Sequence, residues 1–204
     1  MKAIARFFSY VLHPVFVPTA GMLIIFYSGI SVFAAAQQYQ FTMLTLIVLS
    51  TVLLPVSMLP ALIYLRHIQG FTLDERRERL IPLFFTTICY YVGYILIKRL
   101  TDGANMFSLF LLASTVVVFV LLAISLFWKV SMHTAGAGGI LALIAILSIL
   151  YNVDLTLLTA LAILCAGIIF SARLALDTHS LSQLSVGFLV GFGVVFVLMS
   201  YFLR

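Results

Sequence analysis

Seven apolar runs determine what this chain can fold into. Each is about 18 to 25 residues long, enough for a helix to cross ~30 Å of hydrocarbon. They cover residues 14–34, 41–65, 80–98, 106–128, 134–151, 154–172 and 181–203. Because backbone polar groups must find partners inside a bilayer, such runs form helices. The sequence therefore predicts an all-α fold, a polytopic transmembrane helical bundle of about six or seven spans.

Composition supports a membrane protein with a single domain. Hydrophobic residues make up 64% of the chain and charged residues 8%, whereas a soluble domain is roughly 45–50% apolar. Only short polar connections separate the runs, so residues 1–204 form one domain, with 1–13 as an interfacial segment before Pro14. Cys89 and Cys165 lie inside apolar runs, where thiols pack as small hydrophobes. We expect neither a disulfide nor a metal site.

Proline and glycine predict where the helices depart from regularity. Pro55 and Pro60 should kink the second span, whereas Pro82 lies in the first turn of the third, where a missing N–H is tolerated. The GAGG run, Gly136 to Gly139, continues into a span. It therefore favours close helix packing over a phosphate-binding loop.

The order of the spans places the polar chemistry on one side of the membrane. Alternating spans put the loops 66–79, 129–133 and 173–180 on the same side as the N-terminus. All four histidines lie on that side: His13, His67, His133 and His179. Each of these loops leads into the start of a helix, where free amides and the helix dipole favour an anion.

The richest of these loops lies within Ser171–Gly187, SARLALDTHSLSQLSVG. It combines a fixed positive charge, Arg173, with a titratable nitrogen, His179, a pairing that suits phosphate chemistry. On a continuous helix of ~100° per residue, residues six apart lie on different faces, so a turn must bring these two together. Gln183, four residues after His179, can share its helical face.

Together these motifs give a resemblance to a known family. A Lys129-x-Ser131-x-His133 segment is followed by a hairpin and then by Arg173, five residues and His179. This order resembles the type 2 phosphatidic acid phosphatase superfamily of integral membrane lipid phosphatases, over roughly Leu73 to Gly191.

The family carries three motifs, and the chain departs from each in a definable way. Its Ser-Arg, five residues, His, three residues, Asp motif matches at Arg173 and His179, with Gln183 in place of the acid. Its Pro-Ser-Gly-His motif matches at Ser131 and His133, with Val130 and Met132 in place of the proline and glycine. Its Lys, six residues, Arg-Pro motif is echoed ahead of Pro82 by three basic residues: Arg76, Arg77 and Arg79.

The resemblance implies a phosphohistidine mechanism on a lipid phosphate or (poly)prenyl diphosphate. His179 would attack phosphorus as neutral imidazole and His133 would protonate the departing oxygen. Gln183 would orient the His179 ring without supplying charge. The substrate-binding set would be Lys129, Arg173, Ser131 and one or more of Arg76 and Arg79.

The same resemblance bears on location and partners. It implies a multi-pass protein of the bacterial plasma (inner) membrane that uses membrane lipids, with no cofactor, metal or nucleic acid. Eight of the 11 basic residues lie on the histidine side, which favours the cytoplasm. Bacterial family members usually act at the outer face, and the side of the active face stays open, as do the lipid and the oligomeric state.

Other interpretations remain. Gln183 and the altered first motif also fit a non-catalytic descendant that binds anionic lipid headgroups or a membrane partner, and Gln183→Asp would separate the two. Asp177 is a candidate replacement for the missing acid. His13 and His67 are typical interfacial anchors. Haem or metal ligation by the histidines is disfavoured because no pair has close helical ligand spacing.

Overall fold

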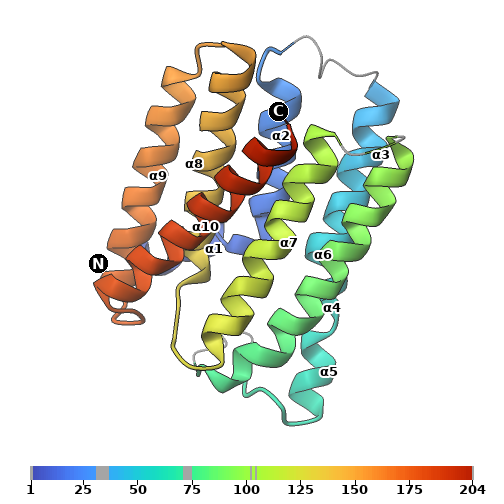
Figure 1. The fold of residues 1–204 in the computed structure, drawn as a ribbon. Coiled ribbons are helices and arrows are strands. Elements are labelled where there is room, and N and C mark those ends of the chain that lie inside the picture. Colours follow the sequence, from blue (N-terminus) through green and yellow to red (C-terminus); the bar gives the residue numbers. More distant parts are fainter. Residues whose placement is uncertain (1, 31–36, 71–74, 102, 104, 204) are drawn as a thin grey trace.

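Long helices run side by side through the molecule, and they follow the predicted apolar runs (Figure 1). The computed structural model describes residues 2–30, 37–70, 75–101, 103 and 105–203. Within these residues, seven helical segments are long and apolar enough to cross a membrane. The predicted all-α transmembrane bundle is therefore confirmed. The end of the first predicted span, 31–34, and residues 73–74 of the charged loop lie outside the described residues.

The elements in chain order are α1 (Lys2–Val11), η1 (Pro14–Phe16), α2 (Val17–Tyr27), α3 (Gln37–Val48), η3 (Leu49–Leu53), α4 (Leu54–Ser57), α5 (Leu59–Tyr64), η4 (Arg77–Arg79), α6 (Leu80–Leu100), α7 (Met106–Ser125), α8 (Met132–Tyr151), α9 (Thr156–Ala175) and α10 (Leu181–Phe202).

Prolines interrupt the second span where the sequence predicted. The π-helical turn η3 precedes Pro55, and the helix breaks at Met58 between α4 and α5, just before Pro60. A proline removes a backbone donor and crowds the carbonyl four residues earlier, so the helix widens or breaks there. Pro82 is the third residue of α6 and leaves that helix intact.

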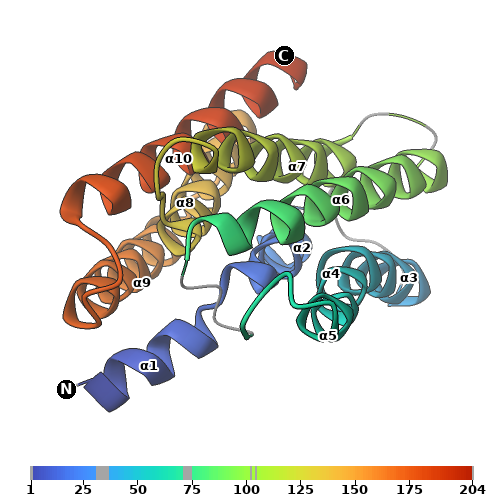
Figure 2. The ribbon, with the colours of Figure 1, turned by 90° about the horizontal axis from the view of Figure 1, so that it is seen from below.

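The core lies where α2, α3 and α6 meet α7, α8 and α10. α2 packs against α3, α7 and α8, and in the view from below it lies between α8 and α3 (Figure 2). The fully buried side chains of this core include Met22, Ile25, Met43, Ile47, Phe110, Leu143 and Leu147.

Glycines bring α8 and α10 into backbone contact. A Cβ added at Gly138 would overlap the carbonyl oxygen of Phe188, and one added at Gly191 would overlap that of Ala135. The predicted packing role of the GAGG run is therefore confirmed. This close approach also holds the starts of the two helices together, because the Ser131 N–H donates to the Gln183 carbonyl at 3.3 Å.

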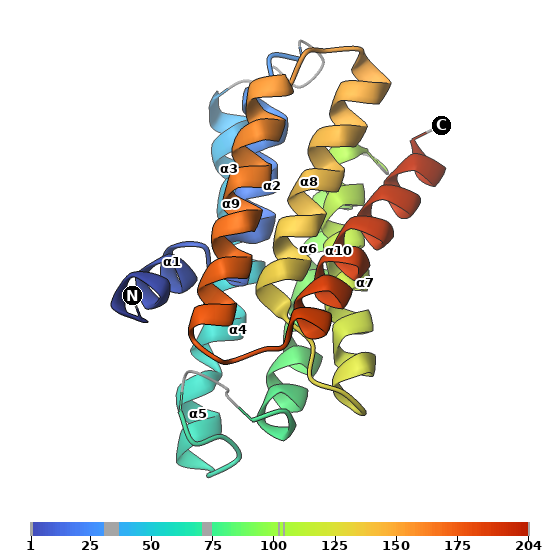
Figure 3. The ribbon, with the colours of Figure 1, turned by 90° about the vertical axis from the view of Figure 1, so that its left-hand side faces the viewer.

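Helix ends alternate between two sides of the bundle, as the order of the spans requires. The connections α5–α6, α7–α8 and α9–α10 lie at the lower end in Figures 1 and 3, and the connections α6–α7 and α8–α9 lie at the upper end with the C-terminus. We call the lower end the histidine side, since it carries His67, His133 and His179.

The N-terminal helix α1 runs across the bundle. Figure 3 views α1 nearly along its axis, whereas α8 and α9 stand upright. The helix contacts α9 and turns into α2 through Pro14 and η1. This is the orientation expected of an interfacial segment, whose place at a membrane surface stays a prediction.

Candidate functional site

A tight turn between α9 and α10 folds His179 back over Arg173. Asp177 adopts the left-handed conformation, with φ 55°, after the last turn of α9. The N–H and the hydroxyl of Thr178 then both donate to the Arg173 carbonyl, at 3.4 and 3.1 Å. The predicted convergence of Arg173 and His179 is therefore present, and the local backbone creates it.

The His179 imidazole lies between two guanidinium groups. Arg173 Nη2 is 3.4 Å from Nδ1, and Arg79 Nη1 is 3.5 Å from Nε2. His179 is 7% exposed and Arg79 is 4% exposed. Arg79 is anchored by donating to the Val130 carbonyl at 3.3 Å. An imidazolium would place an N–H against each of these donors, so the geometry suits the neutral ring.

Electrostatics favour the same state. Burial in the first place, and then the positive charges of Arg173, Arg79 and Lys129, lower the pKa of His179 from 6.5 to about 3. The neutral ring has a lone pair at physiological pH, while Arg79 and Arg173 flank it and Lys129 adds further positive charge. An imidazole nucleophile beside an oxyanion-binding group has this combination.

The predicted substrate-binding residues divide into those that act on His179 and those that cap a helix end. Lys129, Arg79 and Arg173 act on His179. Arg76 instead donates to the Ser125 and Leu126 carbonyls at the end of α7, so it caps that helix.

Ser131 is fully buried and forms the N-cap of α8, where its Oγ accepts from the Thr134 N–H at 3.4 Å. This bond satisfies one of the free amides at the start of the helix. A contact of Ser131 with substrate stays a prediction.

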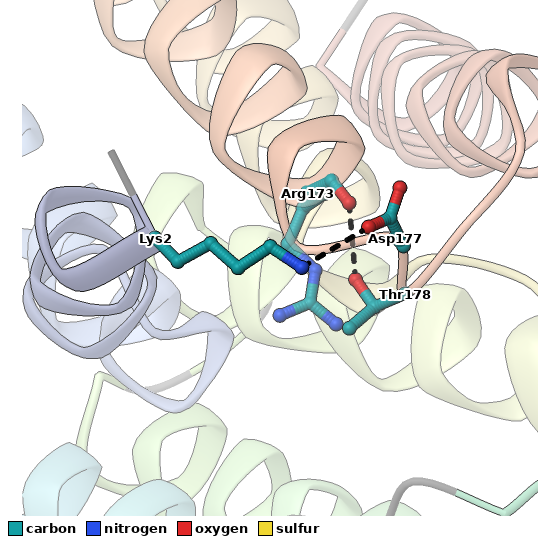
Figure 4. A network of polar contacts seen from close by, with 4 residues as sticks. All are labelled: Lys2, Arg173, Asp177 and Thr178. Atoms are coloured by element: carbon teal, nitrogen blue, oxygen red, sulfur yellow. Dashed lines mark hydrogen bonds and ion pairs between the residues drawn. The ribbon is translucent and has the colours of Figure 1, made fainter.

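Gln183 and Asp177 were expected to support the His179 imidazole. Their side-chain oxygens instead bind other groups. The Gln183 Oε1 accepts from the Ser180 N–H at 3.2 Å in a capping box. Asp177 is exposed and pairs with Lys2 Nζ at 3.4 Å, which ties α1 to the turn (Figure 4). A hydroxyl lies next to His179 Nδ1, that of Thr178, with Oγ1 at 3.3 Å.

His133 belongs to a second cluster at the start of α8. Its Nε2–H donates to the Ser9 carbonyl at 3.1 Å, and its ring meets that of His13 edge to face, with centroids 5.3 Å apart. The sequence favoured an anchoring role for His13, and the structure instead places it beside a predicted catalytic residue.

Both clusters open into one cavity of about 950 Å³. Its charged groups and histidines come from the histidine side, together with the nearby hydroxyls: Arg6, Ser9, His13, Arg79, His133, Arg173, Thr178 and His179. Residues of the spans line the rest, most of them apolar, among them Leu59, Leu83, Phe110, Val117 and Val195, with Thr86, Tyr90 and Ser114 as hydroxyl-bearing exceptions. The cavity is therefore amphipathic, with cations at one end and hydrocarbon beyond.

The contribution of α1 was missed at the sequence level, although a signal for it exists. Arg6, Ser9, Tyr10 and His13 are spaced i, i+3, i+4 and i+7, as on one face of a helix, and all four line the cavity. In a short N-terminal segment this polar stripe is also typical of a helix lying at a membrane surface. The spacing alone does not distinguish a helix that lines a cavity from one that lies at a membrane surface.

Within the described residues, no three histidine, cysteine or acidic side chains lie close enough together to hold a metal ion. Comparison of the chain with family models, curated proteins and solved structures gave no match.

Proposed function

We propose that this protein is a membrane lipid phosphatase of the phosphatidic acid phosphatase type, acting on a lipid phosphate or diphosphate. The observation that carries the proposal is the buried His179 imidazole between Arg79 and Arg173, at the polar end of an amphipathic cavity. The resemblance of the Arg173–His179 spacing to the family motif supports it independently.

In the proposed reaction, a ring nitrogen of His179 attacks phosphorus and forms an N–P bond. The bond to the lipid oxygen breaks, and its electron pair leaves with the lipid. Arg79, Arg173 and Lys129 stabilise the negative charge on the equatorial oxygens. His133 supplies a proton to the leaving oxygen where that oxygen needs one. Water then hydrolyses the phosphohistidine and releases inorganic phosphate.

Cavity shape supports a lipid substrate. The polar lining lies where the headgroup would meet the arginines, and the apolar lining continues between spans toward Phe110 and Val195. An acyl or prenyl chain gains hydrophobic stabilisation there, at about 0.8 kcal/mol per buried methylene. A water-soluble phosphate ester would leave that surface unused.

The proposal predicts that His179→Ala abolishes phosphate release from phosphatidate, phosphatidylglycerol phosphate and undecaprenyl diphosphate in detergent micelles. His67→Ala is the matched control, because it removes a histidine of the same side whose ring has no recorded contact with His179. Equal activity of His179→Ala and the unmodified protein would remove the mechanism.

One observation favours a second function, binding of anionic lipid headgroups without turnover. The oxygens of Gln183 and Asp177 have Ser180 and Lys2 as partners, and among the described residues no carboxylate is bonded to the His179 ring. A carboxylate behind a catalytic histidine can contribute ~10⁴ in rate. Saturable binding of phosphatidate with no phosphate release by the unmodified protein would identify this function.

A further inference from the structure

The Ser9–His13 segment contributes a second set of polar groups to the cavity, next to the His179 cluster. The backbone carbonyl of Ser9 accepts the His133 Nε2–H, and the His13 ring lies against the His133 ring. Ser9 and His133 are 124 positions apart in the sequence and meet only in the fold. They line the same cavity as Arg79 and His179.

Within this segment, a buried hydroxyl lacks a partner. Ser9 is 8% exposed, and its Oγ has no hydrogen-bond partner among the described residues. Buried polar groups in native proteins are nearly always satisfied, so this hydroxyl calls for a partner, a water or a ligand atom, that the protein itself does not supply. His13 adds a donor: its Nδ1 accepts from the Val15 N–H at 3.3 Å, which places the proton of the neutral ring on Nε2.

Arg173 connects the two sets of groups. Its guanidinium acts electrostatically on His13, His133 and His179. The charge around it is uneven. Arg79 and Lys129 reinforce it at His179, whereas the Ser9–His13 segment offers neutral donors, and Arg6 also lines the cavity.

We infer that Ser9 and His13 form a subsite for a second phosphate group, so that the preferred substrate is a lipid diphosphate. This inference rests on the proposed function. The terminal phosphate of such a lipid carries up to two negative charges and the inner phosphate one. The more positive cluster around His179 matches the terminal group, and the neutral donors with the shared Arg173 match the inner group.

The protonation of His133 agrees with a diphosphate substrate. In the neutral ring its single N–H is bonded to Ser9, so proton donation would require the imidazolium. With a diphosphate, the N–P bond to His179 forms as the bridging P–O bond breaks, and the electron pair leaves on the lipid monophosphate. That leaving group is a far weaker base than an alkoxide and departs without a proton.

The test compares two non-hydrolysable ligands of equal chain length, a prenyl methylenediphosphonate and a prenyl phosphonate. The unmodified protein should bind the diphosphonate more tightly. Ser9→Ala and His13→Ala should each lower the ratio of the two affinities about tenfold, the loss expected for one hydrogen bond to a charged group. His13→Gln, which keeps a donor, should restore part of the ratio.

Ser50→Ala is the matched control, because Ser50 is a buried serine whose hydroxyl is satisfied by the Leu46 carbonyl at 2.7 Å. It should leave the ratio unchanged. Equal affinity of the unmodified protein for the two ligands would overturn the inference, and so would an unchanged ratio in both Ser9→Ala and His13→Ala. Because neither ligand is hydrolysed, these outcomes are independent of the His179→Ala test of the proposed function.

Discussion

At the scale of the residue, the chemistry of the candidate site depends on one imidazole kept neutral among cations. His179 is buried and meets an arginine at each ring nitrogen. The sequence could indicate that His179 pairs with Arg173, because both residues lie within one stretch of seven residues that includes a turn. It could not distinguish Arg79 from Arg76, because that depends on which side chain of the η4 turn faces inward toward Val130.

The depressed pKa of His179 predicts an acid-sensitive fold. Between its folded pKa of about 3 and the unfolded value of 6.5, the unfolded chain binds more protons, so stability falls as pH falls through 6.5 toward 3. For this one group the loss between pH 7 and pH 5 is about 2 kcal/mol.

Thermal unfolding in detergent at pH 7 and pH 5 measures this effect. The unmodified protein should lose more stability on acidification than His179→Gln, which has no titrating ring, with His67→Gln as the control that retains the full loss. Equal losses in the unmodified protein and His179→Gln would contradict the assigned pKa.

At the scale of the element, the sequence predicted the features that depend on local rules. Pro55 and Pro60 interrupt a helix wherever it packs, and the GAGG run permits close approach whichever helix meets it. Which helix packs against the GAGG run cannot be predicted from the neighbouring sequence. Gly187 and Gly191 of α10 complete the helix contact, against Ser131 and Ala135.

The contact between α8 and α10 predicts opposite effects for two glycines on one helix. Gly191→Ala places a Cβ against the Ala135 carbonyl, whereas the same change at Gly193 meets no atom within 4 Å. We expect Gly191→Ala to lower the free energy of unfolding by about 1–3 kcal/mol, the usual cost of overpacking. Gly193→Ala should be neutral or stabilising, because alanine is the better helix former.

Circular dichroism melts of both variants in detergent measure the difference. Phosphatase activity should fall with stability, since α8 begins at Ser131 as its N-cap and carries His133, while His179 immediately precedes Ser180, the N-cap of α10. If Gly191→Ala melts like Gly193→Ala, the two backbones are not in contact as described.

At the scale of the whole molecule, the fold could be predicted further than the site. Composition and run length establish an all-α bundle, because a bilayer leaves the backbone few alternatives. The site also requires α1 to lie across the bundle and reach His133 through Ser9. That docking joins residues 124 positions apart, and no local pattern specifies it. The same limit applies to Gln183, whose capping bond competes with the role that its spacing suggested.

The alternation of helix ends makes a prediction about the intact protein. Gln69 and Ser180 belong to connections on the histidine side, whereas Gly103 and Asn152 belong to connections on the opposite side. With Cys89 and Cys165 replaced by serine, single cysteines at these four positions should react with a membrane-impermeant maleimide in sealed vesicles as two pairs. Labelling of Gln69→Cys without Ser180→Cys, or of all four alike, would contradict the topology. The pair that reacts from outside also identifies which side of the membrane the arginines and histidines face, and therefore from which side a phosphorylated headgroup must reach them.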